Sequence, residues 1–229
     1  MLVAIIPARK NSIRIKKKNI KSFFGKTMLT RAIDLVKKTK IFDYICVTTD
    51  DLHVKKICEK KNVSLIINRP KKLSSNKIST QNVIKHACEY LKKIKKLNFK
   101  YVCCLYPCTP LLNPEDLVIS FKTLKKNPKK FVYPVIRYRH PIQRAFKLSK
   151  NLEPKFYNIK NTFIDTSKFS PSYHDSGQFY FGTYENWISK KKFMHIDAKC
   201  LELPFYRAVD IDNKEDWKIA EIFYRSKKF

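Results

Sequence analysis

Three groups of polar residues in the sequence have types and spacing that could do chemistry. The first follows the apolar stretch at residues 2–6, where a basic loop carries Arg9, Ser12, Arg14 and Lys18. Arginine offers forked donors and lysine a point charge, and both suit phosphate groups. The loop lacks the glycine patterns of the Walker and dinucleotide-binding motifs. It therefore indicates either a phosphate site or an ordinary solvated charge cluster.

The second group is the pair Asp210 and Asp212, near the end of the chain. Carboxylates at positions i and i+2 of an extended segment lie on the same side of the backbone. Such a pair suits Mg²⁺, which takes one or two carboxylates and completes its shell with water and substrate phosphates. The alternative is that both residues help to cap the helix expected after Asn213. The residues alone leave both interpretations open.

The third group lies in residues 173–180, YHDSGQFY. Gly177 is one of only three glycines in the chain, which favours a special backbone conformation or a close ligand approach there. Asp175 and Gln178 could bind sugar hydroxyls or amides. Ser176, His174 and Asp175 are adjacent in sequence and so do not form a catalytic triad. A single histidine without paired ligands favours a local hydrogen bond for His174.

An alternation of strands and helices must position these groups. Apolar runs predict strands at residues 2–6, 44–48, 63–67, 101–105 and 131–136. Amphipathic spacing and capping signals predict helices at residues 27–38, 52–60 and 80–96, with a fourth opening at Asn113-Pro114. The pattern predicts an α/β fold with a mostly parallel sheet, and such sheets bind ligands beyond the carboxyl ends of their strands.

The alternation breaks after about residue 137. Residues 137–175 are rich in Tyr, Pro, Arg and Asn, with short strand-like pieces at 144–148 and 155–158. We expect one domain over residues 1–229, with 137–175 inserted as a hairpin region that covers a site or pairs with another subunit. Strands at 178–182 and 199–203 and a helix at 214–224 follow.

Composition narrows the class of protein. No apolar run approaches the roughly 18 residues of a membrane helix, and the N-terminus lacks a signal-peptide pattern, so we expect a cytoplasmic protein without a membrane partner. The seven cysteines are odd in number and predict reduced, mostly buried thiols. The net charge of +30 raises nucleic acid as an alternative partner. We favour a solvated basic surface, because the lysines spread over several helix faces and no nucleic-acid-binding module is present.

Several segments together resemble one known family. Residues 5–12, IIPARKNS, followed by Lys18-Asn19, are similar to the I-P-A-R-x-[GN]-S-K…K-N signature of the sugar-acid cytidylyltransferases, the CMP-sialic acid synthetase family. The resemblance continues over nearly the whole chain at Arg69-Pro70, LYPCTP at 105–110, VDID at 209–212 and EDW at 215–217. Tyr106-Pro107 and DSGQFY at 175–180 are most similar to the branch that acts on pseudaminic acid.

The resemblance implies a three-layer Rossmann-like nucleotidyltransferase fold and a reaction. In that reaction the anomeric hydroxyl of a nine-carbon 2-keto sugar acid, here pseudaminic acid, attacks the α-phosphate of CTP and pyrophosphate leaves. N-acetylneuraminic and legionaminic acids are the alternatives, and an eight-carbon acid is disfavoured by the Gln178 motif. The implied nucleotide-binding residues are Ala8, Arg9, Ser12, Lys18, Asn19, Arg69 and Pro107.

The remaining implied roles concern the sugar, the metal and a second subunit. The implied sugar-binding residues are Tyr106, Asp175 and Gln178; the implied Mg²⁺ ligands are Asp210 and Asp212; and Arg9, Lys18 and Asp212 are the implied catalytic residues. The resemblance also implies a homodimer in which the inserted region reaches the neighbouring sugar site, with Arg137, Arg139 and Arg144 as candidates for its carboxylate.

Three positions depart from the family pattern. Ile13 replaces the usual lysine after the serine, Lys16 stands where proline is common, and Asn76 stands where an aspartate often follows the Arg-Pro loop. The Ile13 substitution implies that one phosphate contact is either missing or supplied by Arg14 or Lys16.

Overall fold

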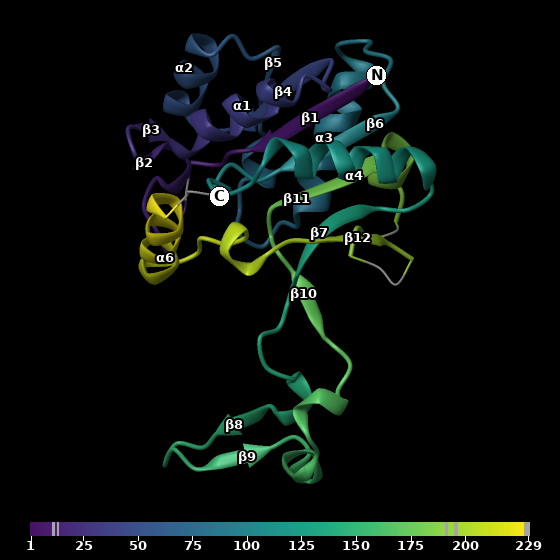
Figure 1. Cartoon of the computed structure of the whole chain (residues 1–229). Helices are drawn as coiled ribbons and strands as arrows, with labels where there is room; N and C mark the ends of the chain where they lie inside the picture. Colours follow the sequence, from purple (N-terminus) through teal and green to yellow (C-terminus); the bar gives the residue numbers. More distant parts are fainter. Residues whose placement is uncertain (11, 13, 191, 195–196, 227–229) are drawn as a thin grey trace.

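The computed structural model describes residues 1–10, 12, 14–190, 192–194 and 197–226. Ile13 therefore lies outside the described residues. A mixed sheet in the order β10-β7-β11-β6-β1-β4-β5 forms the centre of the molecule, and β12 pairs with β7 (Figure 1). Its strands are β1 (Leu2–Pro7), β4 (Tyr44–Thr49), β5 (Leu65–Asn68), β6 (Tyr101–Leu105), β7 (Val132–Arg137), β10 (Tyr173–Asp175), β11 (Phe179–Thr183) and β12 (Lys199–Glu202).

The strands from the first half of the chain pair in parallel. β1 lies between β4 and β6, with Ala4 opposite Ile45 on one side and Cys103 on the other. The second half adds β11 and β10 in antiparallel pairing, and then β12, which runs parallel to β7. The predicted mostly parallel sheet is therefore confirmed, with two antiparallel strands in its second half.

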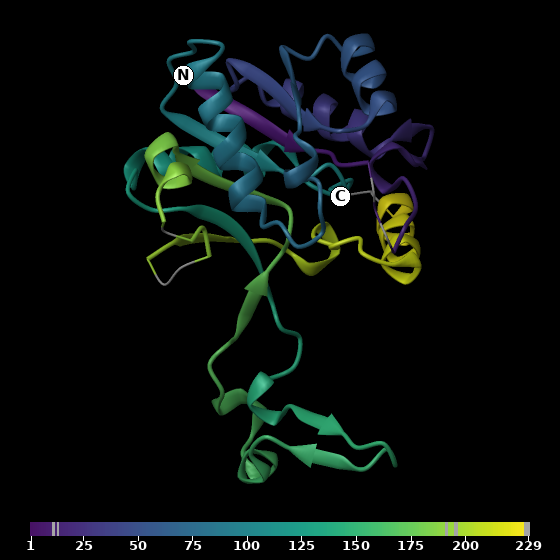
Figure 2. The ribbon, with the colours of Figure 1, turned by 180° about the vertical axis from the view of Figure 1, so that it is seen from behind.

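Helices cover both faces of the sheet and make three layers (Figures 1 and 2). The core on one face joins β1 residues Leu2, Ala4 and Ile6 to helices α1 (Met28–Thr39), α2 (Leu52–Lys60) and α4 (Pro114–Lys126). The core on the other face joins Val3 and Ile5 to helices α3 (Thr80–Lys93) and α5 (Tyr184–Ile188). Because side chains alternate along a strand, the continuous apolar run of β1 supplies both cores.

Side-chain caps start the helices close to the predicted residues. Thr27 accepts a hydrogen bond from the amide of Thr30 at 3.1 Å, and Asp51 accepts one from His53 at 2.8 Å. Asn113 and Asp116 form a capping box at the start of α4. These caps satisfy amide groups that have no partner within their helix.

Several element boundaries differ from the expected ones, and the differences at β5 and α3 have an identifiable cause. β5 begins at Leu65, two residues late, because the Ser64 hydroxyl accepts the hydrogen bond of the Ile45 amide where a ladder carbonyl would otherwise do so. Helix α3 ends at Lys93, three residues early, and the chain turns back at Lys96, whose φ is 50°.

A smaller unit closes the carboxyl edge of the sheet. Helix α6 (Lys214–Arg225) packs on the short hairpin β2 (Ser22–Phe23) and β3 (Lys26–Thr27). Phe23 and Trp217 meet edge to face, with ring centroids 5.4 Å apart. The 3-10 turns η1 (Lys18–Ile20) and η6 (Phe205–Arg207) belong to the loops that this unit supports. The basic loop and the aspartate pair are thus brought to the same edge.

A long arm leaves the body between β7 and β10 (Figures 1 and 2). It contains the hairpin β8 (Phe146–Leu148) and β9 (Pro154–Phe156) and the 3-10 turns η3 (Ile142–Arg144), η4 (Ile159–Phe163) and η5 (Thr166–Lys168). Apolar side chains on it face solvent: Leu152 is 76% exposed and Phe163 85%. Among the described residues, many of the exposed large apolar side chains lie on this arm.

All seven cysteines are free thiols and six of them are buried, as predicted. Burial raises the pKa of the Cys46 thiol to about 12, so that thiol is inert at neutral pH. Within the described residues, no helix is long and apolar enough to cross a membrane.

Candidate active site

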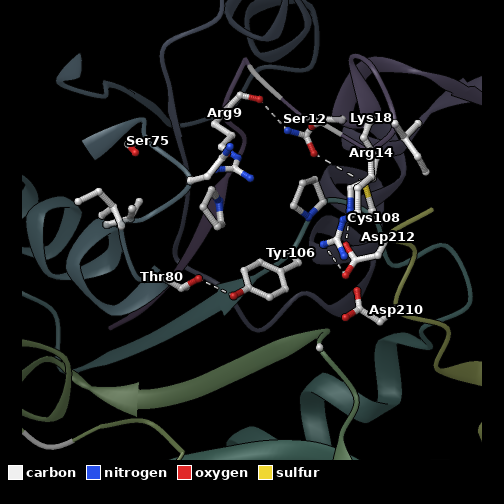
Figure 3. A pocket seen from close by; sticks show the side chains of 18 of the residues that line it. Arg9, Ser12, Arg14, Lys18, Ser75, Thr80, Tyr106, Cys108, Asp210 and Asp212 are labelled. Carbon is white, nitrogen blue, oxygen red and sulfur yellow. Dashed lines mark hydrogen bonds and ion pairs between the residues drawn. The ribbon is translucent and has the colours of Figure 1, made fainter. Parts of the chain in front are cut away.

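A cavity of about 390 Å³ opens beyond the carboxyl ends of β1, β5 and β6 (Figure 3). The basic loop after β1 forms one wall, and the loop after η6 forms the opposite wall. Predicted site residues that line the cavity are Arg9, Ser12, Lys18, Asn19, Arg69, Tyr106, Pro107, Asp210 and Asp212. Parallel pairing places these strand ends together, although the residues span some two hundred positions in sequence.

The basic loop is anchored so that its charges face the cavity. Ala8 is fully buried, and its amide donates to the Thr48 carbonyl at 3.0 Å. The Asn19 amide nitrogen donates to the Arg9 carbonyl at 3.0 Å, which closes the loop on itself. The Arg9 guanidinium makes no hydrogen bond or ion pair with any described residue and points into the cavity (Figure 3). It is therefore available to an anionic ligand.

Arg69 lies at the inner end of the cavity and is only 7% exposed. It donates to the Thr48 carbonyl at 2.8 Å, and its own amide donates to the Thr49 carbonyl. Burial lowers the pKa of Arg69 to about 10, with Arg9 adding to the effect and Asp50 opposing it. The guanidinium is still charged at neutral pH and sits in a position fixed by β4.

The two aspartates differ in their surroundings. Desolvation in the cleft and the neighbouring charge of Asp212 raise the pKa of Asp210 to about 6. Asp212 is paired instead, with Arg14 at 2.7 Å and Lys18 at 3.4 Å, and the Lys18 ammonium also donates to the Ile211 carbonyl at 2.5 Å. Basic groups from the opening loop thus contact the acidic loop directly.

Helix capping is done by other residues. Asn213 accepts from the amides of Glu215 and Asp216, and the Asp216 carboxylate accepts from the amides of Asp212 and Asn213. The side chains of Asp210 and Asp212 are therefore not used as caps. This geometry disfavours the capping interpretation of the pair.

Gly177 packs directly against Asp210. Its φ is +65°, and a Cβ added there would lie 2.8 Å from an Asp210 carboxylate oxygen. Both reasons for a glycine at this position are therefore present: a left-handed backbone and a close approach. The contact joins the third predicted group of residues to the second.

The three predicted sugar-binding residues take different positions. Tyr106 lines the cavity, and its hydroxyl shares a 2.5 Å hydrogen bond with Thr80. Asp175 and Gln178 lie on either side of Gly177 and outside the cavity lining. Asp175 accepts from the Tyr180 hydroxyl at 2.5 Å and from the Gly177 amide at 3.2 Å. Gln178 is buried and donates to the Arg207 carbonyl at 3.2 Å.

His174 makes the local contact predicted for it. Its Nδ1–H donates to the Asp175 carbonyl at 2.9 Å, and its ring packs on Tyr138. It has no position in the cavity lining.

The carboxylate pair fits a divalent cation shared with a substrate. The described residues contain no group of three or more His, Cys, Asp or Glu that could hold a metal alone. Two carboxylates beside a basic cavity match the habit of Mg²⁺, which relies on substrate phosphates for much of its coordination. A cation there would also relieve the repulsion that raises the pKa of Asp210.

Sequence reasoning missed several lining residues. Ser75 and Thr80 come from the loop before α3 and from its first turn, and Cys108 comes from the loop after β6. The Cys108 thiol donates to the Asn19 side-chain oxygen at 3.7 Å, and burial raises the pKa of Cys108 to about 12. In the sequence, the helix start after Ser79 indicates the position of Thr80. The two prolines on either side of Cys108 indicate that Cys108 lies in a loop.

The chain is similar to known proteins over nearly its whole length. The family model described as cytidylyltransferase matches residues 3–227. A pseudaminic acid cytidylyltransferase of Campylobacter jejuni is 32% identical over 223 residues, which are 97% of this chain and 96% of the relative. A CMP-N,N'-diacetyllegionaminic acid synthase of Legionella pneumophila is 25% identical and covers 96% of this chain and 94% of the relative.

Solved structures share the fold. A CMP:2-keto-3-deoxy-manno-octonic acid synthetase complexed with CTP matches with a TM-score of 0.70 at 13% identity, over 98% of each chain. The predicted three-layer nucleotidyltransferase fold is thereby confirmed.

Proposed function

Because this chain belongs to the cytidylyltransferase family, we propose that it transfers CMP from CTP to the anomeric hydroxyl of pseudaminic acid, a nine-carbon 2-keto sugar acid, and releases pyrophosphate. The observation that carries the proposal is the meeting of Arg9 and Lys18 with Asp210 and Asp212 around one cavity. Nucleotidyl transfer depends mainly on positioning and on neutralising phosphate charge. Arg9 and Lys18 can neutralise that charge directly, and Asp210 and Asp212 can do so through a divalent cation that they would hold.

The nucleotide half of the cavity is the basic loop together with Arg69. Arg9, Ser12 and Lys18 would hold the triphosphate, and Arg9 and Lys18 would stabilise the charge that develops on departing pyrophosphate. Asn19 and Arg69 would contact the cytidine beside Pro107. Support comes from the fixed positions of Asn19 and Arg69, each of which is less than one-tenth exposed and hydrogen-bonded to backbone.

Asp210 and Asp212 would hold a divalent cation, which we propose is Mg²⁺. When bound, this ion would neutralise phosphate charge and favour ionisation of the sugar hydroxyl. The chain's own part is to present two carboxylates at a set distance from Lys18 and Arg14. Arg14 and Lys18 pair with Asp212 in this structure. With CTP and a divalent ion bound, both side chains could turn from Asp212 to the phosphates, and Asp212 would be free to hold the ion.

The sugar would bind between Tyr106 and the Gly177 turn. The Gln178 side-chain oxygen is buried and has no hydrogen-bond partner among the described residues, which makes it an acceptor for a sugar hydroxyl or amide. Asp175 has both carboxylate oxygens engaged within the chain. Its part would be to hold the turn, with sugar contact left to Gln178 and Tyr106.

The protein would act as a homodimer through its arm, whose exposed apolar side chains support pairing with a second copy. Of the three arginines considered for a partner's sugar carboxylate, Arg144 donates to carbonyls of its own arm and Arg139 stacks on Phe205. Arg137 pairs with Tyr173 through the β7–β10 ladder, but its guanidinium makes no hydrogen bond or ion pair with any described residue, and it is the candidate that remains.

Pyrophosphate release tests the function directly. Purified protein with CTP and Mg²⁺ should release pyrophosphate with pseudaminic acid, and little or none with N-acetylneuraminic, legionaminic or eight-carbon acids. Release with another acid would reassign the substrate. If no acid supports release and the protein binds RNA tightly with steep salt dependence, the nucleic-acid-binding alternative is correct and the proposal is wrong.

Loss of a metal ligand should stop turnover without unfolding the chain. We expect Asp212→Asn to lower kcat by at least about 100-fold, since even outer residues of metal sites cost 10-fold to 100-fold. Circular dichroism should show a native spectrum. Near-normal turnover would remove Asp212 from the metal site.

A further inference from the structure

Arg207 occupies a junction between three loops of the site. It ends η6, three residues before Asp210. One of its terminal nitrogens bridges both carboxylate oxygens of Asp116, at 3.0 and 2.8 Å. Its backbone carbonyl accepts from the side-chain amide of Gln178 at 3.2 Å. Arg207 therefore contacts the start of α4 and the glycine turn from within the loop that carries the aspartates.

Through Asp116, Arg207 is connected to the loop that lines the nucleotide half of the cavity. Asp116 is the third residue of α4, and its carboxylate also accepts from the Asn113 amide at 3.0 Å. Asn113 ends the loop that begins at Tyr106 and carries Cys108. The pair thus links the loop after β6, which lines the nucleotide cavity, to the loop of Asp210.

Through Gln178, the junction at Arg207 is connected to the turn at Gly177. At this turn the loops have the least room to change their separation. Gly177 sits so close to Asp210 that a single added carbon would lie 2.8 Å from its carboxylate. The Gln178 carbonyl also accepts from the Tyr106 amide at 2.9 Å. Loops in such contact must keep their separation within a few tenths of an ångström, and the Arg207 carbonyl is a direct link between them.

A contribution to the free energy of unfolding does not by itself explain the ion pair between Arg207 and Asp116. The side chain of Asp116 is 6% exposed and that of Arg207 is 21%. The attraction within a buried ion pair offsets little more than the free-energy cost of removing its two charges from water. The main effect of the Arg207–Asp116 pair is therefore to hold the two loops in one arrangement. Leu203, Ala208 and Ile211 already bury the apolar side of the same segment.

We propose that Arg207, held by Asp116, is a positioning residue that sets the place of Asp210 and Asp212 relative to CTP and to the Gly177 turn. Arg207 itself touches neither substrate nor metal. This inference rests on the proposed function, because it assigns the pair a part in metal and sugar binding at the same site.

The test compares Arg207→Gln with wild type by Mn²⁺ binding in the presence of CTP, followed by electron paramagnetic resonance, and by steady-state kinetics. We expect Mn²⁺ affinity and kcat to fall by about 10-fold to 100-fold, as for other residues that orient metal ligands. The KM for CTP should change less than about threefold, because the proposed nucleotide contacts Arg9, Lys18 and Arg69 lie on loops to which neither Arg207 nor Asp116 belongs. Arg207→Lys should recover part of the loss.

Lys130→Gln is the matched control, because Lys130 forms an ion pair with Asp197 at 2.9 Å and neither residue lines the cavity. It should leave Mn²⁺ affinity and kcat unchanged. Native Mn²⁺ affinity and kcat in folded Arg207→Gln would overturn the inference. Should that variant fail to fold, Asp116→Asn decides by the same criteria, since asparagine still offers an acceptor to the Asn113 amide. Failure of wild type to bind Mn²⁺ with CTP would instead overturn the proposed function.

Discussion

Asp210 is held in an environment that opposes its own charge. Desolvation first, and then the charge of Asp212, raise the pKa of Asp210 from 3.8 to about 6. A carboxyl with a raised pKa destabilises the fold once it ionises, so this penalty develops as pH rises from about 4 to 6 and is complete above that range. A pair of carboxylates that binds a divalent cation would carry this free-energy penalty when no cation is bound.

We therefore predict that Asp210→Asn stabilises the protein while it abolishes turnover. Because the side chain opens to the solvent of the cleft, we reduce the gain to about 1 kcal/mol at pH 8, or roughly 2–4 °C in Tm. Thermal melts of variant and wild type should differ at pH 8 and coincide near pH 4. A difference independent of pH would contradict the assignment of the penalty to this carboxyl.

Gly177 offers a second test at the residue scale, with a matched control in the same chain. Gly177 and Gly25 both have positive φ, +65° and +78°, but a Cβ at Gly25 would have nothing within 4 Å. Alanine should cost about 1–2 kcal/mol of backbone strain at either site. Only Gly177→Ala should also raise the Mg²⁺ concentration needed for half-maximal activity. Equal effects of both variants on that concentration would show that the Asp210 contact is unimportant.

At the scale of elements, the carboxyl edge of the sheet explains why distant motifs meet. β1, β5 and β6 run in parallel, so the loops after them share an edge. β12 runs parallel to β7, and the loop that follows it brings Asp210 to that same edge. The antiparallel β11 begins there and contributes the Gly177 turn.

The arm is an element whose order depends on few contacts. Arg144 donates to the carbonyls of Asn161, Thr162 and Ile164, and so ties η3 to η4. Arg144→Ala should increase amide exchange over residues 159–168 and leave exchange in the sheet unchanged, because the arm has little core of its own. Lys150→Ala, an exposed change in the same arm, is the control. Unchanged exchange over 159–168 would show that other contacts hold this turn.

At the scale of the whole molecule, apolar exposure and charge are distributed differently. The net charge of +30 favours solubility and attracts anionic ligands to the cleft. The arm, by contrast, presents Leu152, Tyr157 and Phe163 to solvent. Such a concentration of apolar side chains away from the body favours an interface with another chain.

We predict that Phe163→Glu combined with Leu152→Glu yields a monomer by size-exclusion chromatography with light scattering, because two charges would be desolvated in the interface. Leu52→Glu, a change of an equally exposed leucine on α2, should leave the oligomer intact. A wild-type protein that is monomeric and fully active would contradict the dimer proposal.

Most helices and strands, and the chemistry of the two charged loops, follow from local signals in the sequence. Apolar runs and caps are local signals, so β1, α1, α2, β6 and α4 begin within a residue or two of prediction. The basic loop and the aspartate pair also carry their chemistry in residue type and spacing. The family signature relates both groups to one reaction independently of any tertiary contact.

Tertiary structure alone decided how these groups relate. It placed Gly177 against Asp210 and directed the Asp175 carboxylate to the Tyr180 hydroxyl and the Gly177 amide. It also connected Arg207 to both Asp116 and Gln178. Each of these contacts joins residues whose separation depends on loop paths and on the pairing of β11 and β12. A local sequence pattern indicates which kinds of group a side chain can bind. Only the folded chain decides which of those groups lie within reach, because a side chain that is engaged in one contact is not free to make another.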